Sequence, residues 1–138
     1  NHLAIMTEKS VAVSHNSITW LDFGLATTAT YGSNSRFMSS GKAAMWAGDA
    51  TVDKWLKADG TTANDLTTIR SVIVTALLND TASANYKLDA YSATDLNLDG
   101  VTQLTGPQNE LNVLLHNIIR YPSNTTGSAS YTVKGNLP

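Results

Sequence analysis

The sequence predicts an α+β fold, in which N-terminal antiparallel strands precede two loop–helix units. Segments rich in β-branched and aromatic residues lie at positions 11–13 and 18–23. Two amphipathic segments follow later in the chain, at positions 64–78 and 108–119. A short acidic loop precedes each amphipathic segment. Together these features indicate strands in the first part of the chain and helices in the second.

Composition limits the classes of function. The chain has 138 residues, 42% of them hydrophobic and 14% charged, with a net charge of −2. Such a length suits one domain, and the near-neutral charge argues against nucleic acid or an anionic membrane as a partner. No apolar run is long enough to predict a membrane span. Because the chain has no cysteine, we expect packing or a metal, rather than disulfides, to stabilise it.

The first 44 residues are predicted to be a β region. Residues 14–17 form a turn cluster between the two strand candidates, and residues 2–6 resemble the middle of a further strand. The chain starts at Asn1 rather than at Met. We therefore expect a processed or truncated piece of a longer protein, with residues 1–44 forming the end of a larger β-domain.

The two predicted helices have clear apolar faces and start signals. Asn64 is a suitable N-cap for the first helix, and Pro107 can begin the second. We expect the two apolar faces to bury each other. These faces comprise Leu66, Ile69, Ile73, Ala76 and Leu77 in the first helix, and Leu111, Leu114, Leu115, Ile118 and Ile119 in the second.

The two loop–helix units form an internal repeat. Asp49 and Asp95 lie 46 positions apart, and Asp65 and Glu110 lie 45 apart, so the first loop carries one extra residue. The predicted repeats span residues 45–80 and 91–122 of a duplicated region, 45–122. A tail, residues 123–138, follows and has a short strand candidate at positions 131–133.

The second acidic loop, residues 94–100, has the pattern of a calcium loop. Calcium takes six to eight oxygen ligands, and short acidic side chains at alternate loop positions can supply them. Gly100 stands where the loop must turn sharply, but Gly106 stands where the usual final carboxylate is expected. A loop that bulges outward would bring Glu110 into that place. The predicted ligands are Asp95, Asn97, Asp99, the carbonyl oxygen of Val101, and Glu110.

The first acidic loop, residues 48–53, is a poorer version of the same pattern. Lys54 replaces the turn glycine, and Lys57 places a positive charge beside the site. Its predicted ligands are Asp49, Thr51, Asp53, the carbonyl oxygen of Trp55, and Asp65. Asp, Asn and Gly are also common turn residues, so simple turns are the alternative interpretation of both loops.

Enzyme activity is not predicted. No pair of the histidines His2, His15 and His116 has the spacing of zinc ligands, and no Gly-x-Ser-x-Gly motif occurs. Trp46 and Trp55 flank the first loop and are expected to be core anchors.

Three segments give the chain its resemblance to a known family: residues 45–49, the second acidic loop and residues 106–110. They resemble the dockerin type I-like, EF-hand-like calcium regions at the C-termini of large secreted bacterial surface proteins. Thr51 and Lys54 depart from that family's pattern. The resemblance implies two tandem calcium loop–helix units, an extracellular or cell-surface location, and a strand at residues 1–7 whose β-sheet partner lies upstream.

Three functions fit these expectations. The first is a non-catalytic calcium-binding structural module, a subunit of an extracellular filament or adhesin assembled by strand pairing through an unpaired leading strand. The second is a docking module that binds a cohesin-like receptor. The third is an accessory C-terminal domain of a secreted hydrolase. In each case the partners are other protein chains.

Overall fold

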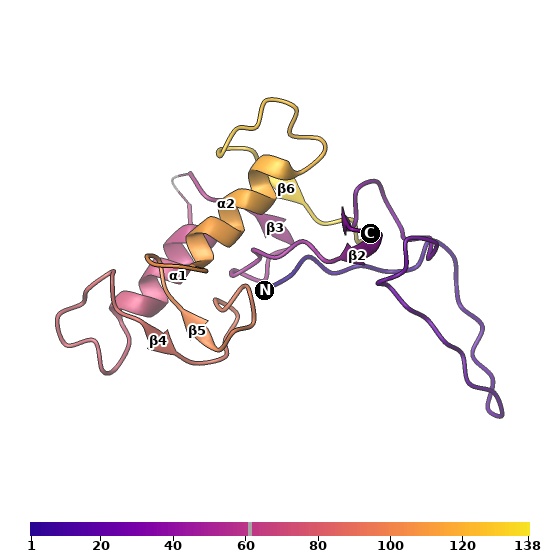
Figure 1. Ribbon diagram of the computed structural model, residues 1–138, viewed down its shortest axis with the longest axis horizontal. Coiled ribbons are helices and arrows are strands. Elements are labelled where there is room, and N and C mark those ends of the chain that lie inside the picture. The colour runs from indigo at the N-terminus through magenta and orange to yellow at the C-terminus, as the bar shows by residue number, and fades with distance from the viewer. Residues whose placement is uncertain (61) are drawn as a thin grey trace.

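The computed structural model describes residues 1–60 and 62–138 and has an α+β fold with small antiparallel sheets (Figure 1). β1 and β2 form a hairpin, whereas the other strands pair across longer distances. In chain order the elements are β1 (Phe37–Ser39), β2 (Lys42–Ala44), β3 (Trp55–Leu56), α1 (Asp65–Val74), β4 (Leu88–Asp89), β5 (Val101–Thr102), α2 (Glu110–Arg120) and β6 (Val133–Lys134).

The last six elements form two halves, each with the order strand, helix, strand, and the halves exchange strands. β3 of the first half pairs with β6 of the second, and β4 of the first pairs with β5 of the second. The registers correspond: Trp55 lies opposite Lys134, as Val101 lies opposite Asp89. The halves are therefore related by an approximate two-fold axis, and each completes the sheet of the other.

The core lies between the two helices, which pack against each other (Figure 1). Ile69 and Ile73 of α1, with Leu114 and Ile118 of α2, are fully buried. This confirms that the apolar faces bury each other at these four positions, whereas Ile119, predicted to share the face of the second helix, is 41% exposed. The core also includes Leu3, Trp46, Ala50, Leu56, Leu96, Tyr121 and Val133. Neither helix in the described part of the chain is long and apolar enough to cross a membrane.

Asparagine side chains cap the start of both helices. Asn64 accepts a hydrogen bond from the amide of Thr67, which confirms its predicted role, and Asn109 does the same for Asn112. The prediction that Pro107 begins the second helix is wrong. Gln108 after it has a φ of 56°, so Pro107 belongs to the preceding turn. Leu77 is also wrongly placed: α1 ends at Val74, and Leu77 is 93% exposed.

A buried asparagine closes the turn after each helix. Asn79 donates to the carbonyls of Ile73 and Ser83 and accepts from the amide of Ser83. Asn124 makes the same three bonds with Ile118 and Ser128. Each side chain satisfies one carbonyl at the helix end and two backbone groups of the turn. Both asparagines lie in Asn-x-Thr glycosylation sequons, but their side-chain nitrogens are engaged in these bonds.

We expect Asn79→Ala and Asn124→Ala each to destabilise the protein by about 1–3 kcal/mol, because buried backbone groups lose their partners. Urea denaturation measures the free energy of unfolding. The control is Asn112→Ala, since Asn112 is exposed on α2 and its replacement should cost less than about 0.5 kcal/mol. Equal losses for all three variants would contradict the role assigned to these turns.

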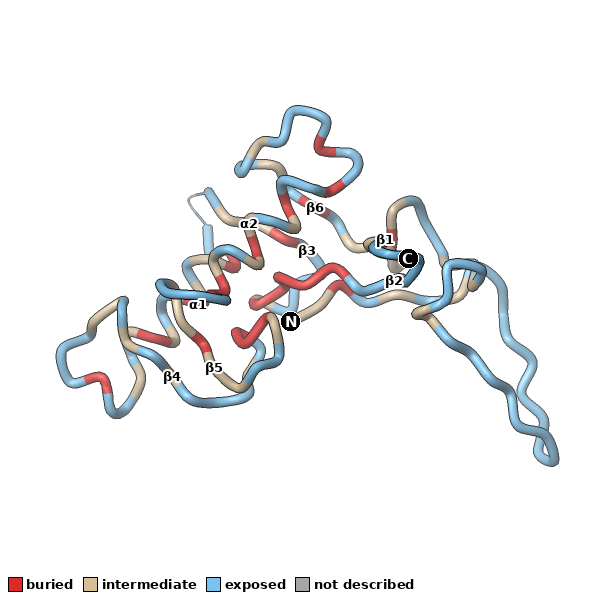
Figure 2. The backbone as a smooth tube through the Cα atoms, in the orientation of Figure 1, coloured by how far each residue is buried: buried red, intermediate tan, exposed pale blue. Residues whose placement is uncertain are grey.

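The strands predicted at 11–13 and 18–23 are absent. Residues 8–22 form an extended arm, exposed throughout, which projects from the rest of the molecule (Figures 1 and 2). A turn from Ser14 to Ser17 closes it, and Thr19 donates to the carbonyl of Ala12. β-branched residues favour strands, but an isolated hairpin needs an apolar surface to pack against, and none covers this arm.

The resemblance implies an unpaired N-terminal strand, but this segment is hydrogen-bonded to other parts of the chain. Leu3 donates to the carbonyl of Trp46, and His2 bridges to Ala47. Tyr31 donates to the carbonyl of Met6 farther along. The N-terminal segment is thus held to residues 31 and 46–47 of this chain, and a further partner upstream stays a prediction. The tail is also built into the fold, since β6 lies in it.

Trp46 is a core anchor and Trp55 is not. Trp46 is buried, packs edge-on against Phe37 and Tyr121 at 5.2 Å between ring centroids, and donates to the carbonyl of Asn34 at 2.7 Å. Trp55 in β3 is 36% exposed. The ammonium groups of two lysines, Lys57 and Lys134, lie 5.6 and 5.4 Å from its ring centroid.

Candidate metal centre

The second acidic loop is wrapped around the carboxylate of Asp95. Asp95 is fully buried, and its two oxygens accept hydrogen bonds from the amides of Asp99 and Gly100. Leu98 and Gly100 have positive φ angles of 61° and 84°, which turn the chain sharply. The loop therefore folds back on its first carboxylate, with the sharp turn at Gly100 that was predicted.

An outward bulge brings Glu110 to this loop. The amide of Glu110, the first residue of α2, donates to the carbonyl of Gln103 at 3.1 Å, and the amide of Gln103 donates to Glu110 Oε2 at 2.6 Å. Residues 104–109 loop out between these contacts, with Gly106 at a φ of 93°. These two hydrogen bonds bring together Gln103 and Glu110, which lie seven positions apart in the sequence.

Three carboxylates converge at this point. One ligand oxygen from each of Asp95, Asp99 and Glu110 lies within 4.8 Å of the other two. In the part of the chain that the structure describes, this is the one such group of acidic, histidine or cysteine side chains. Glu110 is fully buried, and its Oε1 has no hydrogen-bond partner. A buried carboxylate oxygen without a partner is costly unless a cation neutralises it.

The pKa of Glu110 reflects this environment. Burial, with smaller contributions from the neighbouring carboxylates of Asp99 and Asp95, raises the pKa of Glu110 to about 6, against the opposing effect of the hydrogen bonds from the amides of Gln103 and Glu110. The metal-free cluster therefore resists carrying all its negative charges at neutral pH. This cluster could hold a metal ion.

The other two predicted ligands of the second loop lie next to the triad. Asn97 Oδ1 accepts from the amide of Asp99, while its side-chain nitrogen donates to Asp99 Oδ2 at 3.1 Å and to the carbonyl of Gln108 at 2.8 Å. The amide of Val101 donates to Asp99 Oδ1. Both residues therefore contact Asp99, the exposed member of the triad.

The first acidic loop has the same backbone arrangement. The oxygens of Asp49 accept from the amides of Asp53 and Lys54, as those of Asp95 do in the second loop. Val52 and Lys54 have φ angles of 58° and 71°. A positive φ is costly for a β-branched residue such as Val52 and is kept only where surrounding contacts enforce it. The two loops are thus the same structure with different side chains.

The first loop does not gather its carboxylates into a metal-sized cluster. Asp65 accepts three hydrogen bonds, from the amide and hydroxyl of Thr51 and from the amide of Lys57. Asp53 Oδ2 is bonded to Lys57 Nζ at 2.7 Å, and Asp53 Oδ1 accepts from the amide of Trp55. Every carboxylate oxygen of Asp49, Asp53 and Asp65 therefore has a partner.

The pKa values of the first loop agree with this arrangement. Burial raises the pKa of Asp65, and hydrogen bonds from Lys57 and Thr51 only partly offset that effect. For Asp53, partial burial opposes the charge, but the Lys57 ammonium and the Trp55 amide outweigh it and lower the pKa.

The donor atoms of the second loop indicate the kind of ion. The three clustered side chains offer carboxylate oxygens, and no thiolate or imidazole joins them. Hard oxygen donors suit calcium, magnesium or manganese rather than zinc or copper. The residues present therefore fit a hard divalent cation.

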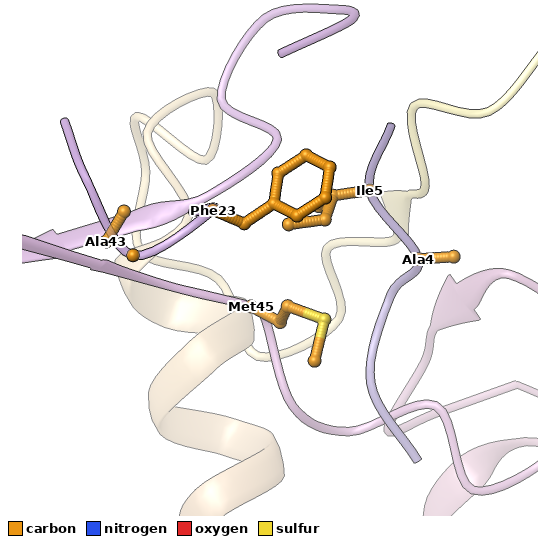
Figure 3. Close-up of a pocket in the computed structure, with 6 residues that line it drawn as sticks. Ala4, Ile5, Phe23, Ala43 and Met45 are labelled. Atoms are coloured by element: carbon orange, nitrogen blue, oxygen red, sulfur yellow. The ribbon is translucent and has the colours of Figure 1, made fainter. Parts of the chain in front are cut away.

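An apolar cleft lies apart from this cluster, between the N-terminal segment and the β1–β2 hairpin (Figure 3). Ile5, Phe23 and Met45 point into it, and it is completed by Ala4, Gly24 and Ala43. None of these side chains can transfer a proton, so the cleft is unsuited to acid–base chemistry.

Two features of the site were missed from the sequence. The ion pair of Lys57 with Asp53 has no clear signal in the sequence, because a four-residue spacing predicts an ion pair only on a helix and these residues lie on either side of β3. The exchange of strands between the halves has no local signal.

No family model, curated protein or solved structure matches the chain.

Proposed function

We propose that this chain is a non-catalytic calcium-binding structural module, with one calcium site formed by the second loop. The observation that carries the proposal is the buried, unpartnered Oε1 of Glu110 beside Asp95 and Asp99. Asn97 and the carbonyl of Val101 would complete the site. This is a dockerin-like assignment, supported by the residues that carry the resemblance.

Calcium fits this donor set better than magnesium. Calcium accepts six to eight oxygens in irregular geometry, including backbone carbonyls, whereas magnesium demands a near-ideal octahedron and keeps several waters. A site that combines carboxylates of a loop with one at the start of the following helix favours the larger ion, which tolerates irregular geometry.

The proposed role of the ion is to hold α2 against the second loop. Glu110 is the first residue of α2. Asp95 lies in the second loop, and its backbone carbonyl accepts a hydrogen bond from Asn1 Nδ2 at 2.6 Å. A bound cation would therefore connect the N-terminus, the loop and the helix. Because the carboxylates repel one another without it, binding should be coupled to folding.

The exposed arm supports a protein partner. Val13, Ile18 and Trp20 are 85%, 80% and 89% exposed, and the burial of these side chains by another chain would remove apolar surface from water. We propose that the module belongs to a secreted or cell-surface protein and contacts other protein chains. Docking to a receptor and attachment to a secreted hydrolase remain the alternatives.

Calorimetric titration of the metal-free chain with calcium and, separately, with magnesium tests the site. Calcium should bind at least about tenfold more tightly than magnesium, because its coordination tolerates this loop. Zinc serves as the control for soft-ligand binding and should not compete at equal concentration. Preference for magnesium or zinc would overturn the assignment.

Calcium affinity should fall as the pH is lowered through about 6, the pKa of Glu110, by up to about tenfold for each unit below it, because one proton competes with the ion. Without calcium, in chelator, the stability of the folded chain should instead rise as the pH is lowered. The folded pKa of Glu110 is above the unfolded value, so its charge opposes folding fully above pH 6 and not below about 4.5.

Titrations at several pH values and melting curves in chelator measure the two trends. Glu110→Gln should lack the chelator trend. Calcium affinity that does not change between pH 7 and 5 would contradict the role of Glu110.

A further inference from the structure

We infer that the first acidic loop is a cation site whose cation is the ammonium group of Lys57, so that the module takes up one calcium ion per chain and not two. This inference rests on the proposed calcium site in the second loop. It concerns the first half of the module, whose loop has the same backbone arrangement as the second loop but, among the described residues, no cluster of three carboxylates.

Corresponding hydrogen bonds show that the two loops share one backbone arrangement, although one extra residue lies between Lys57 and Asp65. The amide of Lys57 donates to Asp65 Oδ2 at 2.7 Å, as that of Gln103 donates to Glu110 Oε2 at 2.6 Å. The amide of Asp65 donates to the carbonyl of Lys57 at 3.0 Å, as that of Glu110 does to Gln103 at 3.1 Å. Lys57 therefore stands where Gln103 stands in the second loop.

The side chains at this equivalent position behave differently. Gln103 points away from the carboxylates and donates from its side-chain nitrogen to the carbonyl of Pro107. Lys57 instead turns to Asp53, the counterpart of Asp99, and places its ammonium 2.7 Å from the carboxylate. The first loop thus contains a positive charge that the second loop lacks.

The acid that closes each loop also differs by one methylene group. Asp65 is the shorter side chain, and both of its oxygens accept hydrogen bonds from Thr51 and Lys57. Glu110 reaches farther, and its Oε1 accepts none. A metal ion in the first loop would have to displace these bonds and approach a fixed ammonium, whereas the second loop offers a free oxygen.

The two halves therefore differ in whether their carboxylates need a metal ion. The first half satisfies its carboxylates with groups of its own chain, so its loop needs no metal. The second half leaves one charge uncompensated until a divalent cation binds. The halves are joined through the β3–β6 and β4–β5 pairs, so a cation bound in the second loop should stabilise both halves.

Calcium stoichiometry, measured on the full chain by flow dialysis, tests the inference. One ion per chain is expected. Two ions of similar affinity would overturn the inference and leave the proposed site intact, whereas no binding would overturn the proposed site and the inference together.

Substitutions at Gln103 test the mechanism in the loop that binds. Gln103→Lys should weaken calcium binding by at least about tenfold, because it places an ammonium where Lys57 has one. Gln103→Met is the matched control: it loses the same contact with Pro107 without adding charge and should change the affinity less than threefold. Equal affinities for the two variants would contradict the inference.

A transplant tests the first loop directly. The variant carries Thr51→Asn, Lys54→Gly, Lys57→Gln and Asp65→Glu, the side chains of the second loop, and should bind a second calcium ion. The same variant with Lys57 retained should bind one. Two ions in both variants would show that the ammonium does not exclude the metal.

Discussion

Replacing Glu110 with glutamine should lower calcium affinity at least about a hundredfold. The change removes one of three clustered charges, and its amide group directs hydrogen-bond donors at the carboxylates of Asp95 and Asp99. The amide oxygen can still accept from Gln103, so the fold should be kept. In chelator the variant should melt at or above the wild-type temperature, because the buried charge is gone.

Two measurements separate this result from general damage. Glu8→Gln, a matched change at an exposed position, should leave both calcium affinity and melting temperature unaltered. Calorimetry gives the affinities. A Glu110→Gln affinity within threefold of the wild type would show that the cluster is not the binding site.

Trp46→Ala should destabilise the protein by about 3–5 kcal/mol, the range for removing a buried aromatic side chain. Trp46 packs between Phe37 and Tyr121 and bonds to the carbonyl of Asn34, so its loss leaves a cavity and an unpaired carbonyl. The N-terminal segment should loosen as well, since Leu3 is hydrogen-bonded to its backbone.

Trp55→Ala provides the comparison in urea denaturation. This side chain is half-exposed and lies beneath two lysines, so its removal should cost about 1 kcal/mol or less. Equal losses for the two tryptophans would contradict the assignment of Trp46 alone as an anchor.

The helices and the acidic loops could be predicted because their signals are local. Asn64 before an apolar repeat marks a helix start, and alternating Asp95, Asn97 and Asp99 mark a tight loop. The position of Glu110 could also be anticipated, because Asp65 occupies the matching place in the other repeat. These features depend on residues close in sequence.

The features that could not be predicted depend on residues far apart. Pairing of β3 with β6 joins positions about 78 apart, and nothing in either dipeptide specifies it. The match between Asn79 and Asn124 was visible in the sequence, at the same spacing as the helices, but required extending the comparison beyond Ile118. Strands were predicted within residues 8–22, which form an exposed arm instead. Strand propensity takes no account of what a strand can pack against.

The most direct test of the calcium assignment is thermal melting of the wild-type chain in chelator and in excess calcium. Calcium at about a hundred times its dissociation constant should stabilise the folded chain by about 2.7 kcal/mol and raise its melting temperature by roughly 8 °C. Magnesium at the same concentration should give a much smaller rise. Identical melting temperatures in calcium and in chelator would mean that Asp95, Asp99 and Glu110 bind no ion.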